Sequence, residues 1–223
     1  MLRPRRCVEV AGHVIALLGA ESTGKSTLAR ELARILSARG VDAVMVPEAL
    51  RLFCDERGRT PAQHEHAGIA RAQTELIEQA RARHQLVLAD TTALMTAVYS
   101  RYIFDDDSLY DAALKAQAQV SATLLMSLDL AWTADGLQRD GPHVREPVDG
   151  LIRSALQGAG LGYNVVAGHG VARVEHALAV IDHLLDAPSR PPRQAGASRW
   201  RWFCDNCDDG ECEQHWLPRA GQV

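Results

Sequence analysis

The 223-residue sequence has few aromatic side chains, no long apolar run and no strong excess of charge of either sign. Aromatic residues make up 5% of the chain, and the formal net charge is −4 at pH 7. A net charge this small argues against a protein that binds nucleic acid through a strongly basic surface. A hydrophobic content of 47% argues against a disordered chain. No stretch approaches the roughly 20 apolar residues of a membrane-spanning helix. We expect one well-buried α/β domain with some chain left over.

Cysteine is scarce and unevenly placed. The chain has five cysteines, an odd number, and three of them lie between positions 204 and 212. This argues against a framework of disulfides and favours a reducing cytoplasm. Residues 1–6 are basic, but no signal-peptide core follows them, which agrees with a cytoplasmic location.

Residues 19–26 fit the phosphate-binding P-loop pattern Gly-x-x-x-x-Gly-Lys-Ser/Thr. The two glycines allow the backbone to approach an anion closely, so that N–H groups can point at phosphate oxygens. Lys25 is expected to reach the β- and γ-phosphates, and the Ser26 hydroxyl to hold Mg²⁺. We therefore expect ATP and Mg²⁺ as ligands, with these nucleotide-binding residues: Gly19, Glu21, Ser22, Thr23, Gly24, Lys25, Ser26 and Thr27.

Short apolar runs alternate with segments of helical periodicity along the chain. The expected strands cover about 13–19, 41–46, 85–89, 122–128 and 163–167. The expected helices cover about 25–39, 61–83, 93–104, a segment begun by the acidic run 105–108, 147–157 and 171–184. We interpret the acidic run as the N-terminal cap of the helix that it begins and as a solvated loop, with a metal site as the alternative. This alternation predicts a mainly parallel sheet with helices on both faces.

Open α/β sheets bind their ligands at the carboxyl ends of the strands. Five candidate features of this chain lie at such ends: the P-loop, Glu48, Asp90, Asp129 and Gly168. Asp90 ends an apolar strand and is expected to act on Mg²⁺, the alternative being a plain helix N-cap. Glu48 could accept the proton of an acceptor hydroxyl or hold a sugar hydroxyl; its alternative is a surface pair with Arg51.

The polar segment after the fourth expected strand carries Arg139 and Arg145. In P-loop kinases a mobile lid at this place brings arginines to the transferring phosphate, so both are candidate catalytic residues. Stacking roles for Trp132 and Tyr163 have weaker support, because a lone aromatic usually belongs to a core. Three histidines show no metal-ligand spacing, and we expect them on the surface: His64, His66 and His84.

These motifs, taken in order, resemble a known family. Gly-Ala-Glu-Ser-Thr-Gly-Lys-Ser at 19–26, Glu48 with Arg51, Asp90-Thr91 and Trp-Thr-Ala-Asp-Gly-Leu at 132–137 look like the ribosylnicotinamide kinase domain of NadR-type proteins. The resemblance covers about residues 13–186. It implies a three-layer P-loop NTPase fold with a five-stranded parallel sheet in the order 2-3-1-4-5. It also implies transfer of the ATP γ-phosphate to the 5′-hydroxyl of nicotinamide riboside, a step of NAD biosynthesis.

The sequence departs from the family pattern at two positions. Ala49 replaces an aromatic residue after the glutamate, and Gln138 stands where a lid arginine is expected, with Arg139 one place later. The family's adenylyltransferase and DNA-binding domains have no counterpart in this sequence, so we do not expect the second step of NAD synthesis. The identity of the phosphate acceptor is therefore less well supported than the kinase chemistry.

Composition changes after Ala187, which divides the chain into a P-loop domain (1–187) and a linker with a Cys/Trp-rich tail (188–223). Cys204, Cys207, Cys212 and His215 form a Cys-x₂-Cys-x₄-Cys-x₂-His array that could hold Zn²⁺. The alternative is an unmetallated tail that docks through its tryptophans.

Two functions remain open from the sequence. The first is an ATP-dependent nucleoside kinase, whose ligands are ATP and a nucleoside-like small molecule, without a membrane or nucleic-acid partner. The second is a regulatory ATPase that acts as an ATP-binding switch and binds a partner through its C-terminal tail.

Overall fold

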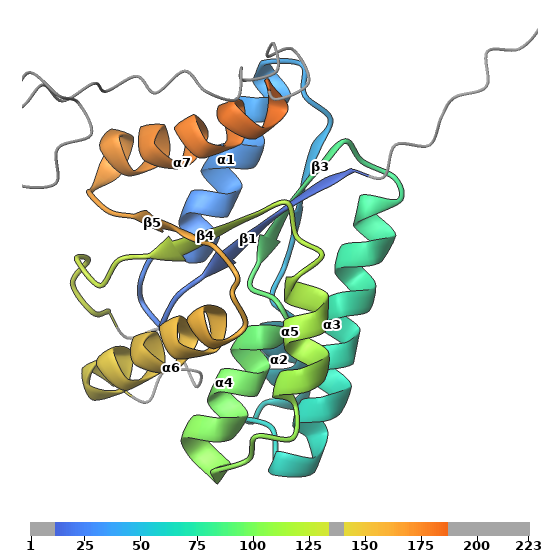
Figure 1. Ribbon diagram of the computed structural model, residues 1–223, viewed down its shortest axis with the longest axis vertical. Coiled ribbons are helices and arrows are strands. Elements are labelled where there is room, and N and C mark those ends of the chain that lie inside the picture. Colours follow the sequence, from blue (N-terminus) through green and yellow to red (C-terminus); the bar gives the residue numbers. More distant parts are fainter. Residues whose placement is uncertain (1–11, 134–140, 187–223) are drawn as a thin grey trace, which may run out of the picture. The chain divides into compact units, whose positions relative to one another are not determined.

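A computed structural model describes residues 12–133 and 141–186, where strands and helices alternate (Figure 1). The strands are β1 (His13–Leu18), β2 (Ala43–Val46), β3 (Leu86–Asp90), β4 (Ala122–Met126) and β5 (Asn164–Val166). The α-helices are α1 (Lys25–Ala38), α2 (Ala49–Arg57), α3 (His66–Arg81), α4 (Ala93–Phe104), α5 (Tyr110–Gln117), α6 (Arg145–Gly158) and α7 (Gly170–Leu185). Short 3₁₀ turns, η1 (Gln63–Glu65) and η3 (Pro142–Val144), precede α3 and α6.

The strands form one parallel sheet in the order β2-β3-β1-β4-β5, which confirms the expected topology. Strand β1 is central, and Leu17 is in register with both Asp90 of β3 and Leu124 of β4. The carboxyl ends of β1 and β3 therefore lie side by side, which puts the loop after β1 next to Asp90. This edge is where ligands of such sheets bind.

Alternate residues of β1 enter the cores on opposite faces of the sheet. Ile15 and Leu17 belong to the core shared with α1 and α7, whereas Ala16 and Leu18 belong to the core shared with α4 and α6. Figure 1 shows α1 and α7 on one face and α3 to α6 on the other. Burial on both faces explains why these strands are continuously apolar rather than alternating.

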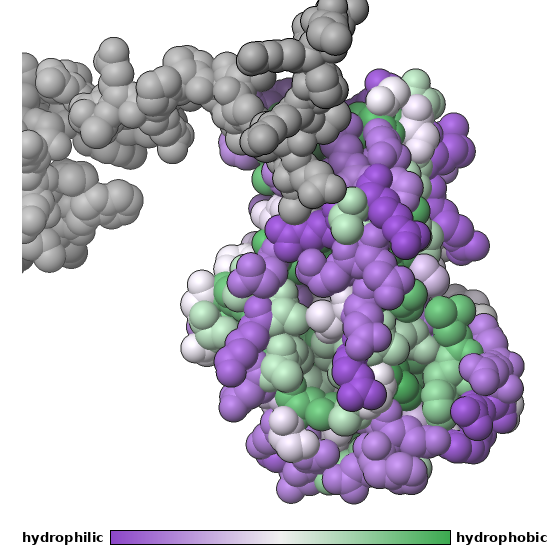
Figure 2. Space-filling model, turned by 90° about the vertical axis from the view of Figure 1, so that its right-hand side faces the viewer, coloured by the Kyte–Doolittle hydropathy of each residue, from purple (hydrophilic) through white to green (hydrophobic). Residues whose placement is uncertain are grey.

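The outer surface carries the polar residues that the helical periodicity predicts. The exposed face of α3 includes Arg71, Glu75 and Glu78. On the side shown in Figure 2, hydrophilic side chains cover most of the surface and hydrophobic ones gather in smaller patches. No helix among the described residues is long and apolar enough to cross a membrane.

Three local expectations need correction. Helix α2 was not anticipated between the second strand and Thr60, and the helix expected from about 61 begins as η1 at Gln63 and continues as α3 from His66. The acidic run forms a loop, but it is not the expected N-terminal cap: Asp105 is the C-cap of α4 with φ 56°, and the N-cap of α5 is Leu109. Within the loop, Asp106 Oδ1 accepts a hydrogen bond from the Ser108 N–H at 2.9 Å. In the described ranges no group of acidic, histidine or cysteine side chains is arranged to hold a metal ion.

Candidate functional site

The P-loop joins β1 to α1 through a backbone that only particular residues allow. Gly24 is the N-cap of α1 at φ 77°, a left-handed conformation that favours glycine. A side chain at Gly19 would bring its Cβ within 2.9 Å of the Met126 Cβ, so glycine is needed there for close approach to β4. Inside the loop, the Thr23 hydroxyl donates to the Ala20 carbonyl at 2.8 Å. These constraints hold the N–H groups at the start of α1 in a shape suited to an anion.

Lys25 and Ser22 tie the loop to its surroundings. The Lys25 ammonium donates to the carbonyls of Gly19 and Ala20 at 2.8 and 2.9 Å, which keeps its positive charge over the loop. The Ser22 hydroxyl accepts from the Thr133 N–H at 2.7 Å. The segment that precedes the expected lid is thus attached to the P-loop.

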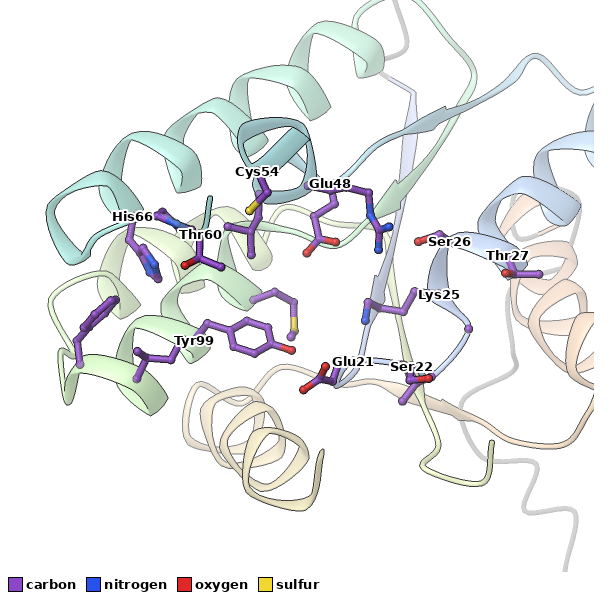
Figure 3. Close-up of a pocket in the computed structure, with 18 of the residues that line it drawn as sticks. Glu21, Ser22, Lys25, Ser26, Thr27, Glu48, Cys54, Thr60, His66 and Tyr99 are labelled. Atoms are coloured by element: carbon purple, nitrogen blue, oxygen red, sulfur yellow. The ribbon is translucent and has the colours of Figure 1, made fainter. Parts of the chain in front are cut away.

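A large cavity extends from the P-loop to the space between α2, α3 and α4, with a volume of about 520 Å³ (Figure 3). Its phosphate end contains the loop residues from Glu21 to Thr27, and Glu48 lies between this end and the other. Arg51 also lines the cavity. The opposite end is largely apolar and is lined by Leu50, Cys54, Thr60, Pro61, Ala62, Gln63, His66, Met95, Tyr99, Ile103 and Phe104. Pockets of this size and character hold drug-sized ligands.

Glu48 is positioned by the turn from β2 into α2. It is the N-cap residue of α2, with φ −70° and ψ 118°, but its side chain makes no capping bond and lines the cavity. The fully buried Gln73 fixes the turn: its Oε1 accepts from the Ala49 N–H at 2.6 Å and its Nε2 donates to the Pro47 carbonyl at 3.3 Å. Ala49 is itself buried, so a small residue fits the position where the resembled family has an aromatic one.

Asp90 lies at the end of β3 beside the P-loop. Its side chain is only 2% exposed, and its Oδ1 atom is buried without a hydrogen-bond partner among the described residues. The N-cap of α4 is Thr92, whose hydroxyl accepts from the Leu94 N–H at 3.4 Å, so Asp90 does not cap that helix. A buried carboxylate oxygen without a protein donor suits a bound cation or its water.

Arg173 of α7 holds three segments of the site together, and the sequence-based reasoning did not find it. Its guanidinium donates to Asp129 Oδ1 at 2.8 Å, to the Gly168 carbonyl at 2.9 Å and to the Thr23 carbonyl at 2.8 Å. Asp129 Oδ2 in turn accepts from the Gly168 N–H at 2.6 Å. Burial alone would raise the pKa of Asp129, but the hydrogen bonds from Gly168 and Arg173 lower it below its ordinary value.

Other predicted residues lie away from the cavity or outside the described ranges. Arg145 begins α6, is 8% exposed and donates to the Leu128 carbonyl at 3.2 Å; it does not line the cavity. Tyr163 packs beside α6, where its hydroxyl accepts from Gln157 at 3.1 Å. Trp132 is described and is not among the residues that line the cavity. The remaining candidates lie outside the residues that the structure describes: Arg139, Cys204, Cys207, Cys212 and His215.

His66 was expected on the surface, and this expectation was wrong. The side chain is 2% exposed and lines the apolar end of the cavity. His64 is exposed as expected, and His84 forms a partly exposed pair with Asp42 at 2.9 Å. The sequence did contain a signal for His66, because it lies on the same helical face as the buried Ile69, Ala70 and Gln73.

The sheet order, the P-loop between β1 and α1 and the acidic residue at the end of β3 define the class: this is a P-loop NTPase fold, of the kind used by phosphotransferases and ATPases. The sequence matches the family described as an AAA domain over residues 14–173. The chain therefore belongs to this AAA-domain family. No curated protein matches the sequence significantly.

Similar solved structures include two of NadR protein. The structure in complex with NR has a TM-score of 0.66 and 21% identity, and covers 78% of this chain and 52% of that chain. The structure in complex with NAD and AMP-PNP has a TM-score of 0.62 and 20% identity, and covers 78% of this chain and 49% of that chain. The chain thus spans about half the length of the NadR chains that it matches.

A deoxyadenosine kinase from M. mycoides, solved with its products dCMP and a flexible dCDP, is also similar. Its TM-score is 0.51 at 14% identity, over 76% of this chain and 98% of that chain. At these identities the three likenesses establish a shared fold.

Proposed function

We propose that this protein is an ATP-dependent nucleoside kinase, with the 5′-hydroxyl of nicotinamide riboside as the favoured phosphate acceptor. The observation that carries the proposal is the continuity of the cavity, which runs from the P-loop past Glu48 into an apolar end and has a total volume of about 520 Å³, in the range of small-molecule sites. The ligands of the similar structures support it: NR and AMP-PNP are bound by NadR, and the products dCMP and dCDP by the deoxyadenosine kinase.

In the proposed reaction the P-loop and Lys25 position the β- and γ-phosphates of ATP. The nucleoside hydroxyl oxygen forms a bond to the γ-phosphorus, and the bond from that phosphorus to the β–γ bridging oxygen breaks, so that ADP leaves. Glu48, which lines the cavity between the P-loop and the apolar end, accepts the hydroxyl proton. Arg51, which also lines the cavity, supplies positive charge to the transferring group.

Mg²⁺ is the cation that fits the P-loop side of the site. Ser26 and Asp90 would hold it, and the buried Asp90 Oδ1, which has no protein donor among the described residues, is the observation that fits this assignment. When bound, the ion would neutralise charge on the phosphates. The chain's own Lys25 and the N-terminus of α1 act on the same phosphate charge.

The test compares ATP turnover with and without nucleosides in the wild type and in Glu48→Gln. A kinase turns over ATP faster when its acceptor is added, and the loss of a general base is expected to lower that stimulated rate by about 100-fold or more. The matched control is Glu56→Gln, because Glu56 lies on the same helix with a side chain that is 76% exposed. Slow hydrolysis that ignores every nucleoside would instead indicate the ATP switch.

A further inference from the structure

Gln73 is a polar side chain at a core position of α3. It is 1% exposed and shares the buried face of the helix with Ile69, Ala70 and Ile77. Glutamine is seldom buried so completely unless its amide is hydrogen-bonded. Both polar atoms of this amide bond the turn between β2 and α2. The core of α3 thus contains an amide group whose partners belong to the segment that carries Glu48.

The hydrogen bonds of Gln73 fall on the peptide groups at either side of the Glu48 Cα. Gln73 Oε1 accepts from the Ala49 N–H at 2.6 Å, and Nε2 donates to the Pro47 carbonyl at 3.3 Å. The Glu48 carbonyl also accepts from the Leu52 N–H of α2 at 3.2 Å. Because φ and ψ describe how these two planar groups are turned about the Cα, the contacts hold Glu48 at φ −70° and ψ 118°. The direction in which its side chain leaves the backbone is thereby fixed.

Glu48 is the N-cap of α2, but its side chain does not act as a cap. An N-cap side chain ordinarily turns back and accepts from an N–H of the first helical turn. The Glu48 side chain makes no such bond, and Figure 3 shows it pointing into the cavity. The Ala49 N–H, a donor of that first turn, is satisfied by Gln73 from another helix. Gln73 thus provides an acceptor that the N-cap side chain does not, and the Glu48 carboxylate stays directed into the cavity.

We propose that Gln73 is a positioning residue: by holding both peptide groups around Glu48, it keeps the carboxylate where the acceptor hydroxyl gives up its proton. This inference rests on the proposed function, which makes Glu48 the general base. Gln73 is not among the residues that line the cavity, so it acts through Glu48 rather than on the substrate. A general base works only within hydrogen-bond reach of the proton, and a misplacement of about 1 Å can lower a rate about 100-fold.

The test is a double-mutant cycle with Gln73→Met and Glu48→Gln. Methionine has nearly the length of glutamine, but it cannot replace the amide donor and is only a weak acceptor. In the wild-type background, Gln73→Met is expected to lower the nucleoside-stimulated kcat by about 10- to 100-fold and to leave the KM for ATP within about twofold. In the Glu48→Gln background there is no base to position, so the same substitution should lower kcat by less than about threefold.

Gln117→Met is the matched control. Gln117 is 2% exposed, and its amide also bonds two partners, the hydroxyls of Thr92 at 2.6 Å and of Thr123 at 2.9 Å. These three residues are not part of the cavity lining. Gln117→Met should lower the melting temperature about as much as Gln73→Met, because both remove a buried amide. Its effect on kcat should be the same factor with and without Glu48→Gln.

A second measurement does not depend on catalysis. Crystal structures of the wild type and of Gln73→Met would show where the Glu48 carboxylate lies in each protein. We expect the carboxylate to move by about 1 Å or more in the variant, the scale of displacement that matters for catalysis. A carboxylate that stays in place overturns the inference, whether or not the protein is a kinase.

The outcomes keep this inference apart from the proposed function. An equal loss of kcat from Gln73→Met with and without Glu48→Gln overturns the inference, since this indicates a purely structural glutamine. If Gln73→Met does not fold, Gln73→Asn enters the same cycle and the same crystal comparison, because its amide is one methylene too short to reach both Ala49 and Pro47. A wild type whose ATP turnover ignores every nucleoside overturns the kinase proposal alone, and the position of the Glu48 carboxylate then decides whether Gln73 holds it.

Discussion

Arg173 links the P-loop to the ends of two strands through one buried guanidinium group. Its side chain is 6% exposed and that of Asp129 is 26% exposed, so water screens this ion pair weakly. The carbonyl of Thr23, which Arg173 also contacts, belongs to the P-loop itself. Arg173 is therefore a positioning residue for the phosphate end of the cavity rather than a group that touches the substrate.

We predict that Arg173→Met lowers the free energy of unfolding by about 3 kcal/mol, because Asp129 loses its partner in a poorly solvated place. For a chain of this size the melting temperature should fall by roughly 6–12 °C. Thermal and urea unfolding would measure both. Arg39→Met is the matched control: Arg39 pairs with Asp182 of α7 at 3.0 Å, but both side chains are nearly half exposed. That change should cost under about 1 kcal/mol, and equal losses in the two variants would contradict this role of Arg173.

At the scale of elements, the connection between α2 and α3 forms one wall of the apolar end of the cavity. Both Glu65 oxygens accept from the Arg59 guanidinium at 2.7 and 2.8 Å, and Oε2 also accepts from the Ala62 N–H at 2.8 Å. The Arg59 hydrogen bonds, with that from Ala62, lower the pKa of Glu65 to about 2. The intervening residues Thr60 to Gln63 are thereby kept against the cavity.

The Glu65→Gln variant is predicted to have a lower melting temperature and a higher nucleoside KM at pH 7, with little change in kcat. Because the folded-state pKa lies below the ordinary 4.5, the contribution of Glu65 is fully present above about pH 4.5. It is lost as the pH falls toward about 2, so the melting-temperature gap from the wild type should narrow over that interval. A gap that stays constant with pH would contradict the ion-pair explanation. Glu75→Gln, in an exposed pair with Arg71, is the control.

Local periodicity was enough to predict most elements of the sheet and its outer helices. The helix expected over 93–104 appears as Ala93–Phe104, and each of the five strands overlaps an expected apolar run. Helix α2 was missed because only Ala49 and Cys54 of its nine residues are buried, which leaves a weak apolar pattern. The strand order came from the family resemblance, since periodicity alone does not determine which strands are neighbours.

The candidate site was only partly predictable, because local sequence patterns reveal motifs but not contacts between residues far apart in the chain. Glu48 and the P-loop are identified by motif and by position at strand ends, and they line one cavity. Arg173 contacts Thr23 across 150 positions, and no local pattern encodes such a contact. Arg145 was selected by analogy with a lid; in the structure it donates to the Leu128 carbonyl, and its catalytic role stays a prediction.

At the scale of the whole molecule, the three hydrophobic cores draw their buried residues from Val14 to Ile181. We keep the division at Ala187 as a proposal and predict that a protein ending there folds cooperatively. Its melting temperature should lie within about 3 °C of the full chain, because every core residue of the described part of the chain is retained. Circular dichroism and thermal unfolding would test this, and an insoluble or molten product would show that the tail contributes to the core.

The central claim is that this chain transfers phosphate from ATP to a nucleoside. Its most direct test is mass spectrometry of the products after incubation with ATP, Mg²⁺ and nicotinamide riboside, with other nucleosides as a panel and Lys25→Ala as the inactive control. We predict a nucleoside 5′-monophosphate formed in equal amount to ADP by the wild type and not by the variant. ADP formed without any phosphorylated nucleoside would contradict the kinase assignment.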